Sequence, residues 1–334
     1  MQKVQILSVS SYLPEEILPS DGLFEEFKSE SQYGIPTNWM SHDMGIRERR
    51  ISQSTLKPSD LAVYAAEKAI KKAGIDAKDI DMVIYCGIER DRPEPATAHT
   101  IANQFNINAK HTFDVANACY GFIEGMKIGT NFISCGLVEN ALIVTSETLS
   151  RIIEPVIEKL KQGMSIEEAK KYIGFLSVGD AGGAVILSKS LNGTTGFETF
   201  NTITASKHVE KCHYSFSKEG EFQGVMAMGN LAALMVKNHT DLIQSTLKQI
   251  GQERFDFLLS HQIGKRPYER LSELDCIKDG ELIKTYDYLG NIASATFPVS
   301  FEKLTKHDNL EAGSKVGGCF AGSGIVIGQI AYTI

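Results

Sequence analysis

Apolar and polar residues follow one another along this chain at two spacings, one typical of helices and one typical of buried strands. After Ser59 or Asp60, either of which is a suitable N-terminal cap, apolar residues recur at the helical spacing until Gly74. An apolar run at residues 81–87 then predicts a strand. A helix followed by a polar turn and a buried strand is typical of α/β folds.

The same order of elements appears again in the second half of the chain. Residues 62–87 and 234–262 each contain a helical pattern, a polar turn after glycine, an aspartate and an apolar strand that ends in polar residues. Such a repeat predicts two similar α/β halves, which we place at residues 1–188 and 189–334. The carboxyl ends of their strands are then expected to face a shared centre, where open α/β sheets bind ligands.

Further segments extend this pattern in the first half. Residues 111–115 and 139–146 read as strands on either side of a helix, which gives a β-α-β unit. Residues 149–172 read as two amphipathic helical pieces, and Ser165 with Glu168 fits a capping box at the start of the second piece. We expect this segment to be an insertion that lies on the core.

The stretch from Phe113 to Gly136 contains the first candidate for chemistry, Cys119, at a predicted helix start. The free N–H groups and the positive dipole end of a helix N-terminus favour a thiolate, so this position is expected to lower the thiol pKa. Glycines at four-residue intervals, Gly121, Gly125 and Gly129, leave one helix face bare for close packing. An ordinary buried cysteine in a tightly packed helix fits this stretch equally well.

Two further polar residues lie at predicted element junctions in the second half. His261 follows an apolar strand, and Asn291 lies in a Gly-Asn turn that opens a small-residue helix. Residues 315–324 read as another glycine turn between two strands. A cysteine, a histidine and an asparagine suggest thiolate chemistry on a carbonyl, with neutral donors for an oxyanion or enolate. A cysteine peptidase uses the same residue types, but here all three lie at strand-to-helix junctions of duplicated halves.

Composition narrows the class of protein further. The chain has 334 residues and a net charge of −7, with no long basic run, which argues against a nucleic-acid partner. We expect no membrane span, because no apolar run approaches the length that one needs. Six scattered cysteines are typical of reduced thiols in a cytoplasmic protein. There is no C-x-x-C pair, so a zinc ribbon is not supported. The glycine cluster at 177–184 is weak evidence for phosphate binding, because G-x-G-x-x-G is not met. We expect no metal site and no cofactor.

Several motifs, taken together and in order, resemble a known family over nearly the whole chain. The sequence is similar to β-ketoacyl-acyl-carrier-protein synthase III and its relatives in the thiolase superfamily. The matching pieces are MGIRER at 44–49, FDVANACYGF at 113–122, VGDAGGAVIL at 178–187, SHQ at 260–262, GNIASA at 290–295 and GGCFAGSG at 317–324. The resemblance implies a thiolase-like fold in which two α/β halves pack as five layers, αβαβα.

The resemblance also implies roles for the candidate residues. Cys119 would take an acyl group from a thioester, while His261 and Asn291 would bind the carbonyl of a second thioester whose α-carbon attacks. The backbone N–H of Cys119 and one from the glycine turn at Gly317 and Gly318 would form the first oxyanion hole. Asparagine at 291 points to a carbon–carbon bond-forming synthase, since hydroxymethylglutaryl-type relatives carry an acid there.

By the same resemblance, substrates arrive as coenzyme A or acyl-carrier-protein thioesters. Trp39 matches a tryptophan that holds the coenzyme A nucleotide, but Asp43 stands where relatives commonly carry its arginine partner. Lys265 and Arg266 match the basic site where a carrier protein docks.

One branch of the family resembles this chain in two additional features, the segment Glu94–Ala98 and the insertion at 149–172. It includes the acyl-condensing thiolase of bacterial olefin synthesis and alkylresorcinol-type ketosynthases. In the olefin enzyme a glutamate matching Glu94 crosses the dimer interface and acts as a base. A helix cap or a solvated position are the ordinary alternatives for Glu94.

The resemblance therefore predicts a homodimeric enzyme that joins an acyl group to malonyl-carrier protein with loss of carbon dioxide. Alternatives within the family are head-to-head condensation of two acyl thioesters and acyl transfer to an alcohol or amine. A non-catalytic partner subunit is the alternative from another class, and the complete Cys-His-Asn set argues against it.

Overall fold

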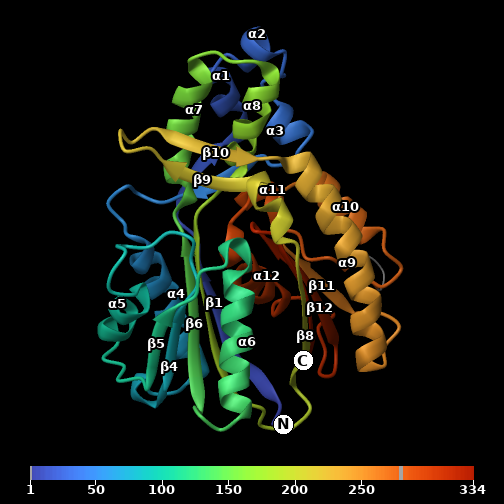
Figure 1. Cartoon of the computed structure of the whole chain (residues 1–334). Helices are drawn as coiled ribbons and strands as arrows, with labels where there is room; N and C mark the ends of the chain where they lie inside the picture. The colour runs from blue at the N-terminus through green and yellow to red at the C-terminus, as the bar shows by residue number, and fades with distance from the viewer. Residues whose placement is uncertain (1, 278–280) are drawn as a thin grey trace.

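A computed structural model describes residues 2–277 and 281–334, and two β-sheets form its centre (Figure 1). Within these residues, one sheet has five strands in the order β1-β7-β6-β4-β5 and another has four in the order β11-β12-β13-β8. The strands of the first sheet are β1 (Val4–Tyr12), β4 (Met82–Tyr85), β5 (His111–Asp114), β6 (Asn140–Glu147) and β7 (Ala181–Lys189). Those of the second are β8 (Gly196–Thr204), β11 (Phe257–Ser260), β12 (Lys315–Gly322) and β13 (Val326–Thr333).

The two sheets have the same sequence of strand directions. In the first, β4 runs parallel to β5 and β6, while β6, β7 and β1 pair in antiparallel fashion. In the second, β11 runs parallel to β12, and β12, β13 and β8 are antiparallel. Leu282 forms a parallel bridge with Leu258 of β11, which corresponds to the pairing of β5 with β4. The expected boundary between the halves, after residue 188, falls at the end of β7.

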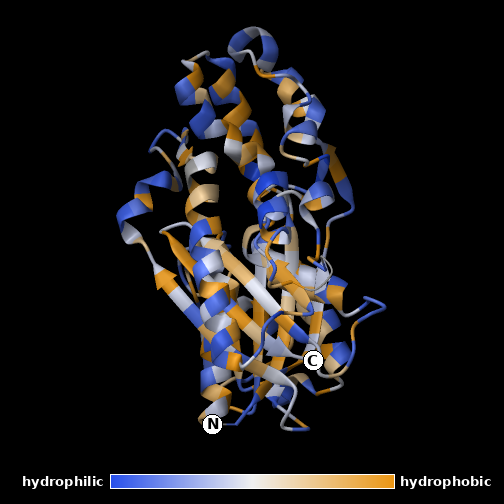
Figure 2. Cartoon of the chain, turned by 90° about the vertical axis from the view of Figure 1, so that its right-hand side faces the viewer, coloured by the Kyte–Doolittle hydropathy of each residue, from blue (hydrophilic) through white to orange (hydrophobic). Residues whose placement is uncertain are grey.

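Helices fill the space between the sheets and cover their outer faces, so the predicted five-layer arrangement is confirmed (Figure 1). α6 (Gly121–Ser134) and α12 (Thr296–Leu304) form the middle layer, and one hydrophobic cluster joins them to strands of both sheets. The outer helices are α4 (Pro58–Ala73) and α5 (Thr97–Gln104) on the first sheet and α9 (Met228–Ile250) and α10 (Lys265–Ser272) on the second. Figure 2 shows hydrophobic residues concentrated along the strands.

A third region lies over one end of both sheets, and we call it the cap. It contains the expected insertion as two helices whose Ser165 hydroxyl accepts the Glu168 N–H at 3.2 Å. The cap comprises α1 (Ser20–Glu26), α2 (Ser29–Tyr33), α3 (Trp39–His42), α7 (Ile153–Lys161), α8 (Ile166–Ile173), β9 (Cys212–Phe216) and β10 (Phe222–Met226), which enclose a hydrophobic cluster of their own. β2 (Glu16–Pro19), β3 (Glu48–Ile51) and α11 (Tyr286–Leu289) are the remaining short elements.

One local prediction is wrong at the level of single residues. α4 begins at Pro58, ahead of the expected caps, because proline suits the first helical position. Asp60 still satisfies a free donor there, since its carboxylate accepts the Lys57 N–H at 2.7 Å.

The bare face predicted for α6 packs directly against the first sheet. A Cβ atom added to Gly121 would lie 2.7 Å from the Cys86 carbonyl oxygen, and one on Gly125 would lie 2.4 Å from the Cys86 sulfur. A Cβ on Gly129 would meet Ile143 at 3.1 Å. The absence of these side chains therefore sets how close α6, and the turn before it, lies to the sheet.

Candidate active site

Cys119, His261 and Asn291 line one enclosed cavity between the two halves, which we call the inner cavity. It holds about 40 Å³ of free space. Its other lining residues are Cys212, Met226, Met228, Leu231, Met235, Ile263, Ala321, Gly322, Ser323 and Ile325. The structure therefore brings together the three residues that the sequence proposed for catalysis, from three separate turns.

Cys119 lies in a single 3₁₀ turn, Ala118–Tyr120, directly before α6. Ala118 has a φ of 47°, a left-handed conformation that is uncommon for a residue with a side chain. Such a turn holds the next residue, Cys119, in a fixed direction at the cavity wall.

The sequence predicted that the helix start lowers the pKa of Cys119, and this prediction is wrong. Burial raises the pKa of Cys119 well above its usual value, and the neighbouring Cys212 and Glu147 raise it further. Desolvation disfavours the charged thiolate and is the largest cause of this shift. The Cys119 thiol is therefore expected to be protonated at neutral pH.

His261 directly follows β11, where its backbone N–H donates to the Cys319 carbonyl oxygen at 2.8 Å. Its Nδ1 is buried and has no hydrogen-bond partner among the described residues. Burial lowers the pKa of His261 to about 4. At neutral pH the ring is therefore neutral, with one nitrogen able to donate and the other able to accept.

Asn291 is held by bonds on its backbone and on its side-chain oxygen. Its N–H donates to the Ser177 carbonyl at 2.8 Å, and its carbonyl accepts the Gly179 N–H at 3.1 Å. Its Oδ1 accepts the Ala293 N–H at 3.0 Å. Because the oxygen is engaged, the amide NH₂ is the group left to donate to a ligand in the cavity.

The predicted oxyanion donor at Gly318 is in the wrong place. Gly317 and Gly318 do not form a turn; Gly318 lies inside β12, paired with Leu259 on one side and Ile330 on the other. The chain reaches the cavity at Gly322 and Ser323, which line it. A Cβ on Gly322 would lie 2.9 Å from the Tyr120 nitrogen, so this strand end abuts the turn that carries the nucleophile.

Glu147 and Cys212 are neighbours of the thiol that the sequence analysis did not single out. Glu147 is fully buried at the end of β6, and burial raises its pKa to about 8. Its Oε1 accepts the Ser294 N–H at 3.2 Å and also the Ser294 hydroxyl. Glu147 could have been suspected, because ligands bind at the carboxyl ends of parallel strands. No comparable signal marked Cys212.

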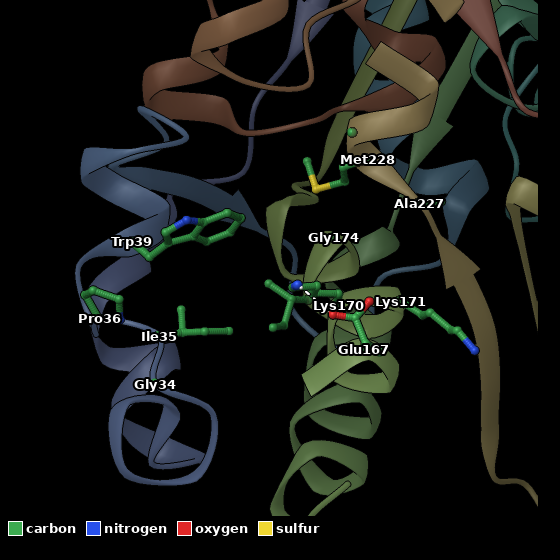
Figure 3. Close-up of a pocket in the computed structure, with 12 residues that line it drawn as sticks. Gly34, Ile35, Pro36, Trp39, Glu167, Lys170, Lys171, Gly174, Ala227 and Met228 are labelled. Atoms are coloured by element: carbon green, nitrogen blue, oxygen red, sulfur yellow. Dashed lines mark hydrogen bonds and ion pairs between the residues drawn. The ribbon is translucent and has the colours of Figure 1, made fainter. Parts of the chain in front are cut away.

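A larger depression in the cap, the outer pocket, is drawn in Figure 3. It holds about 590 Å³. Trp39 forms part of its wall, opposite residues of α8 that include Lys170 and Lys171. Lys170 pairs with Glu167 at 2.9 Å. Met228 lines both the outer pocket and the inner cavity.

The remaining predicted site residues lie outside both spaces. Lys265 and Arg266 are exposed at the start of α10, and Arg266 borders a shallow groove with Lys237 and Arg270 over an apolar floor. Glu94 is exposed in the loop before α5 and does not line the inner cavity of the single chain.

Comparisons with known proteins agree with this arrangement. The family described as 3-oxoacyl-[acyl-carrier-protein (ACP)] synthase III matches residues 113–206. A β-ketoacyl-[acyl-carrier-protein] synthase III of Bacillus cereus is 28% identical, and the match covers 98% of both chains. The acyl-CoA:acyl-CoA alkyltransferase of Shewanella oneidensis is 26% identical over 95% of this chain and 91% of its own.

Solved structures of OleA from Xanthomonas campestris share the fold. One with bound cerulenin has a TM-score of 0.92 and 24% identity, covering 100% of this chain and 97% of its own. The chain is therefore similar to synthase III enzymes in sequence and to OleA in fold. The comparisons support a condensing enzyme of the thiolase type.

In the part of the chain that the structure describes, no helix is both long and apolar enough to cross a membrane.

Proposed function

We propose that this chain is a synthase III-type condensing enzyme that uses Cys119 as its acyl-carrying nucleophile. It transfers an acyl group from a thioester to Cys119 and then condenses that group with malonyl-carrier protein in a decarboxylative Claisen reaction. The observation that carries the proposal is the shared lining of one enclosed cavity by Cys119, His261 and Asn291.

The first half-reaction is a thioester exchange. The Cys119 sulfur attacks the acyl carbonyl, the bond to the donor thiol breaks, and the Cys119 proton ends on the departing thiol. We assign this step mainly to Cys119 and its own turn, and we keep His261, which is neutral at a pKa of about 4, for the second step. The Cys119 N–H and a backbone N–H from the Gly322–Ser323 end of β12 are the donors we assign to the transient oxyanion.

The second half-reaction makes the carbon–carbon bond. Loss of carbon dioxide from the malonyl thioester leaves an enolate, whose oxygen accepts hydrogen bonds from the neutral His261 and the Asn291 amide. The α-carbon then attacks the Cys119 thioester, and the thiol is regenerated with a proton. Neutral donors suit this step, since they stabilise a developing charge without protonating the carbon nucleophile.

Thioester arms reach the cysteine, in this proposal, through the outer pocket. Trp39 and Lys171 lie at that pocket and suit the polar end of a coenzyme A or carrier-protein arm. Asp43 in place of an arginine weakens the case for coenzyme A as donor. Lys265 and Arg266 are the basic residues we assign to docking an acidic carrier protein.

The proposal includes a homodimer joined at the edge of the first sheet. β5 is the edge strand of the first sheet. Phe113 within it, Val115 directly after it, and Ile128 and Phe132 of α6 remain only partly buried in the single chain. An open strand edge with apolar side chains around it suits a second copy of the chain. We propose no cofactor beyond the acyl thioesters themselves.

Head-to-head condensation of two acyl thioesters is the second candidate, favoured by the similarity to the Shewanella alkyltransferase. That reaction has no decarboxylation to create a carbanion, so a base must remove an α-proton. Glu94 is the residue we assign to that base, reaching the partner's cavity across the dimer. Acyl transfer to a small alcohol or amine has no particular observation in its favour.

Glu94→Gln separates the two condensations, because it keeps side-chain size and removes the base. If malonyl-carrier protein is the nucleophile, the variant keeps most of its activity and releases one carbon dioxide per product. Arg92→Gln is the matched control, since Arg92 is an exposed charge in the same loop. Product mass and released carbon dioxide are measured for the wild type and both variants.

The opposite result supports head-to-head condensation. In that case Glu94→Gln collapses activity, Arg92→Gln does not, and product forms from acyl donors alone without carbon dioxide. Failure of every acyl thioester to modify Cys119 contradicts both candidates.

A further inference from the structure

Among the residues that the structure describes, Met228 is the one that lines both the outer pocket and the inner cavity. The outer pocket holds about 590 Å³ and the inner cavity about 40 Å³. Met228 therefore borders both spaces, and Cys119 borders the inner one.

The surroundings of Met228 are built around a missing side chain. A Cβ atom added to Gly174 would lie 2.9 Å from Cγ and 3.0 Å from the sulfur of Met228, and 3.0 Å from Cγ of Met226. Figure 3 shows the Met228 side chain beside Gly174, with Trp39 on the facing wall. Because Gly174 has no side chain, the methionine can lie against its backbone.

Met228 is also suited to movement. It is the first residue of α9, and the preceding Ala227 provides no side-chain cap for the helix. Its side chain is half-buried and unbranched, with three rotatable bonds and a polarisable sulfur, so it can repack at low cost.

We propose that Met228 is a gate between the two spaces, which the thiol-bearing arm of an incoming acyl thioester must displace to reach Cys119. The inference rests on the proposed function for the identity of the arm. With the gate closed, the acyl group on Cys119 is shielded from water until the second thioester enters, which favours condensation over hydrolysis.

The gate is tested by how fast iodoacetamide alkylates Cys119, a reaction that needs access and no catalysis. Met228→Ala removes the gate and raises this rate about tenfold, the gain expected if the open state is about one-tenth populated. Met164→Ala is the control, because Met164 is a half-buried methionine of the cap that lines neither space. It leaves the rate within about twofold of the wild type.

Gly174→Ala is the opposing variant. Its new methyl group pushes the Met228 side chain away from Gly174 and toward the inner cavity, so alkylation of Cys119 slows several-fold. Loss of fold cannot imitate that result, since unfolding exposes the thiol and speeds the reaction. The exposed Cys135 serves as the internal reference, and the fully buried Cys86 and Cys319 report any unfolding.

Two outcomes overturn the gate. In the first, Met228→Ala reacts no faster than Met164→Ala. In the second, Gly174→Ala reacts at or above the wild-type rate. The same proteins are then incubated with acyl-coenzyme A of increasing chain length, and intact mass is followed. If the alkylation rates follow the prediction while no acyl donor modifies Cys119, the gate stands and the proposed function fails.

Discussion

The two halves contain the same turn, but only the turn of the first half places its nucleophilic side chain at the inner cavity. In the first half, Ala118 at a φ of 47° begins the 3₁₀ turn that carries Cys119 into α6. In the second, Ala293 at a φ of 42° begins the 3₁₀ turn that carries Ser294 into α12. Cys119 lines the cavity, whereas Ser294 is buried against Glu147 and Thr145.

This difference shows that backbone geometry alone does not create a reactive group. In the second turn the Ser294 hydroxyl and N–H are both bonded to the Glu147 carboxyl. That contact ties the end of β6 to the segment that carries Asn291. The second turn therefore stabilises the site through its hydrogen bonds to Glu147, while the first turn supplies the nucleophile.

Removing the thiol from the first turn has the largest expected effect. Cys119→Ala loses acyl-enzyme formation and lowers condensation by about four orders of magnitude or more, as is usual for a lost nucleophile. Peptide mapping after incubation of the wild type with acyl donors should place the only stable adduct on Cys119. An adduct on Cys86 or Cys319 contradicts this assignment, and one on Cys212 would show that a second cavity thiol competes.

Changes at His261 and Asn291 test whether the second half serves the second step. His261→Ala or Asn291→Ala should keep detectable acyl-enzyme and lower condensation by roughly two orders of magnitude, the usual loss for an oxyanion donor. Intact mass reports the first step and product formation the second. Equal losses in both steps would show that the division of labour is wrong.

The hydrogen bonds between Glu147 and Ser294 predict that the protein becomes less stable as the pH rises toward 8. The pKa of Glu147 rises from 4.5 to about 8 on folding, so the folded chain keeps a proton that the unfolded chain loses. The contribution of Glu147 to the free energy of unfolding is fully present below about pH 4.5 and is lost as the pH rises to about 8. Glu147→Gln should remove this pH dependence. The free energy of unfolding of the variant should then fall by on the order of a few kcal/mol less than that of the wild type between pH 5 and pH 8.

Urea unfolding at several pH values measures that slope for the wild type and the variant. Glu139→Gln is the control, because it removes an exposed carboxyl directly before β6. Parallel pH profiles for the wild type and Glu147→Gln would mean that Glu147 is ionised in the folded chain.

The smallest expected effect comes from giving the second turn a thiol. Ser294→Cys, made in the Cys119→Ala background, should gain no acyl adduct, because residue 294 lines neither the inner cavity nor the outer pocket. Intact mass after incubation with acyl donors checks it. Acylation at residue 294 would show that the turn itself, rather than its access to the cavity, makes a nucleophile.

The sequence predicted best what depends on local patterns. The spacing of apolar residues predicted the strand before Cys119, the strand that ends at Ser260 and the repeat of helix and strand. The structure contains all three. Cys119, His261 and Asn291 lie at element ends, which is where the pattern placed them.

What the sequence could not give depends on contacts between distant segments. The direction of the Cys119 pKa shift depends on enclosure by both halves, which no local pattern reports. The glycine pair at Gly318 looked like a turn because glycine is common in turns, yet it packs inside a strand where larger side chains would clash. Cys212 and Met228 join the site only because the cap closes over it.

The close packing of α6 has a consequence for how this protein can change over generations. Any side chain at Gly121 or Gly125 collides with Cys86, so substitutions there move the nucleophile itself and are expected to be eliminated by selection. The methionines around the inner cavity bend easily and tolerate replacement. Heritable variation that survives should therefore collect around the acyl group, and new substrate preferences can arise while the position of the reacting sulfur stays the same.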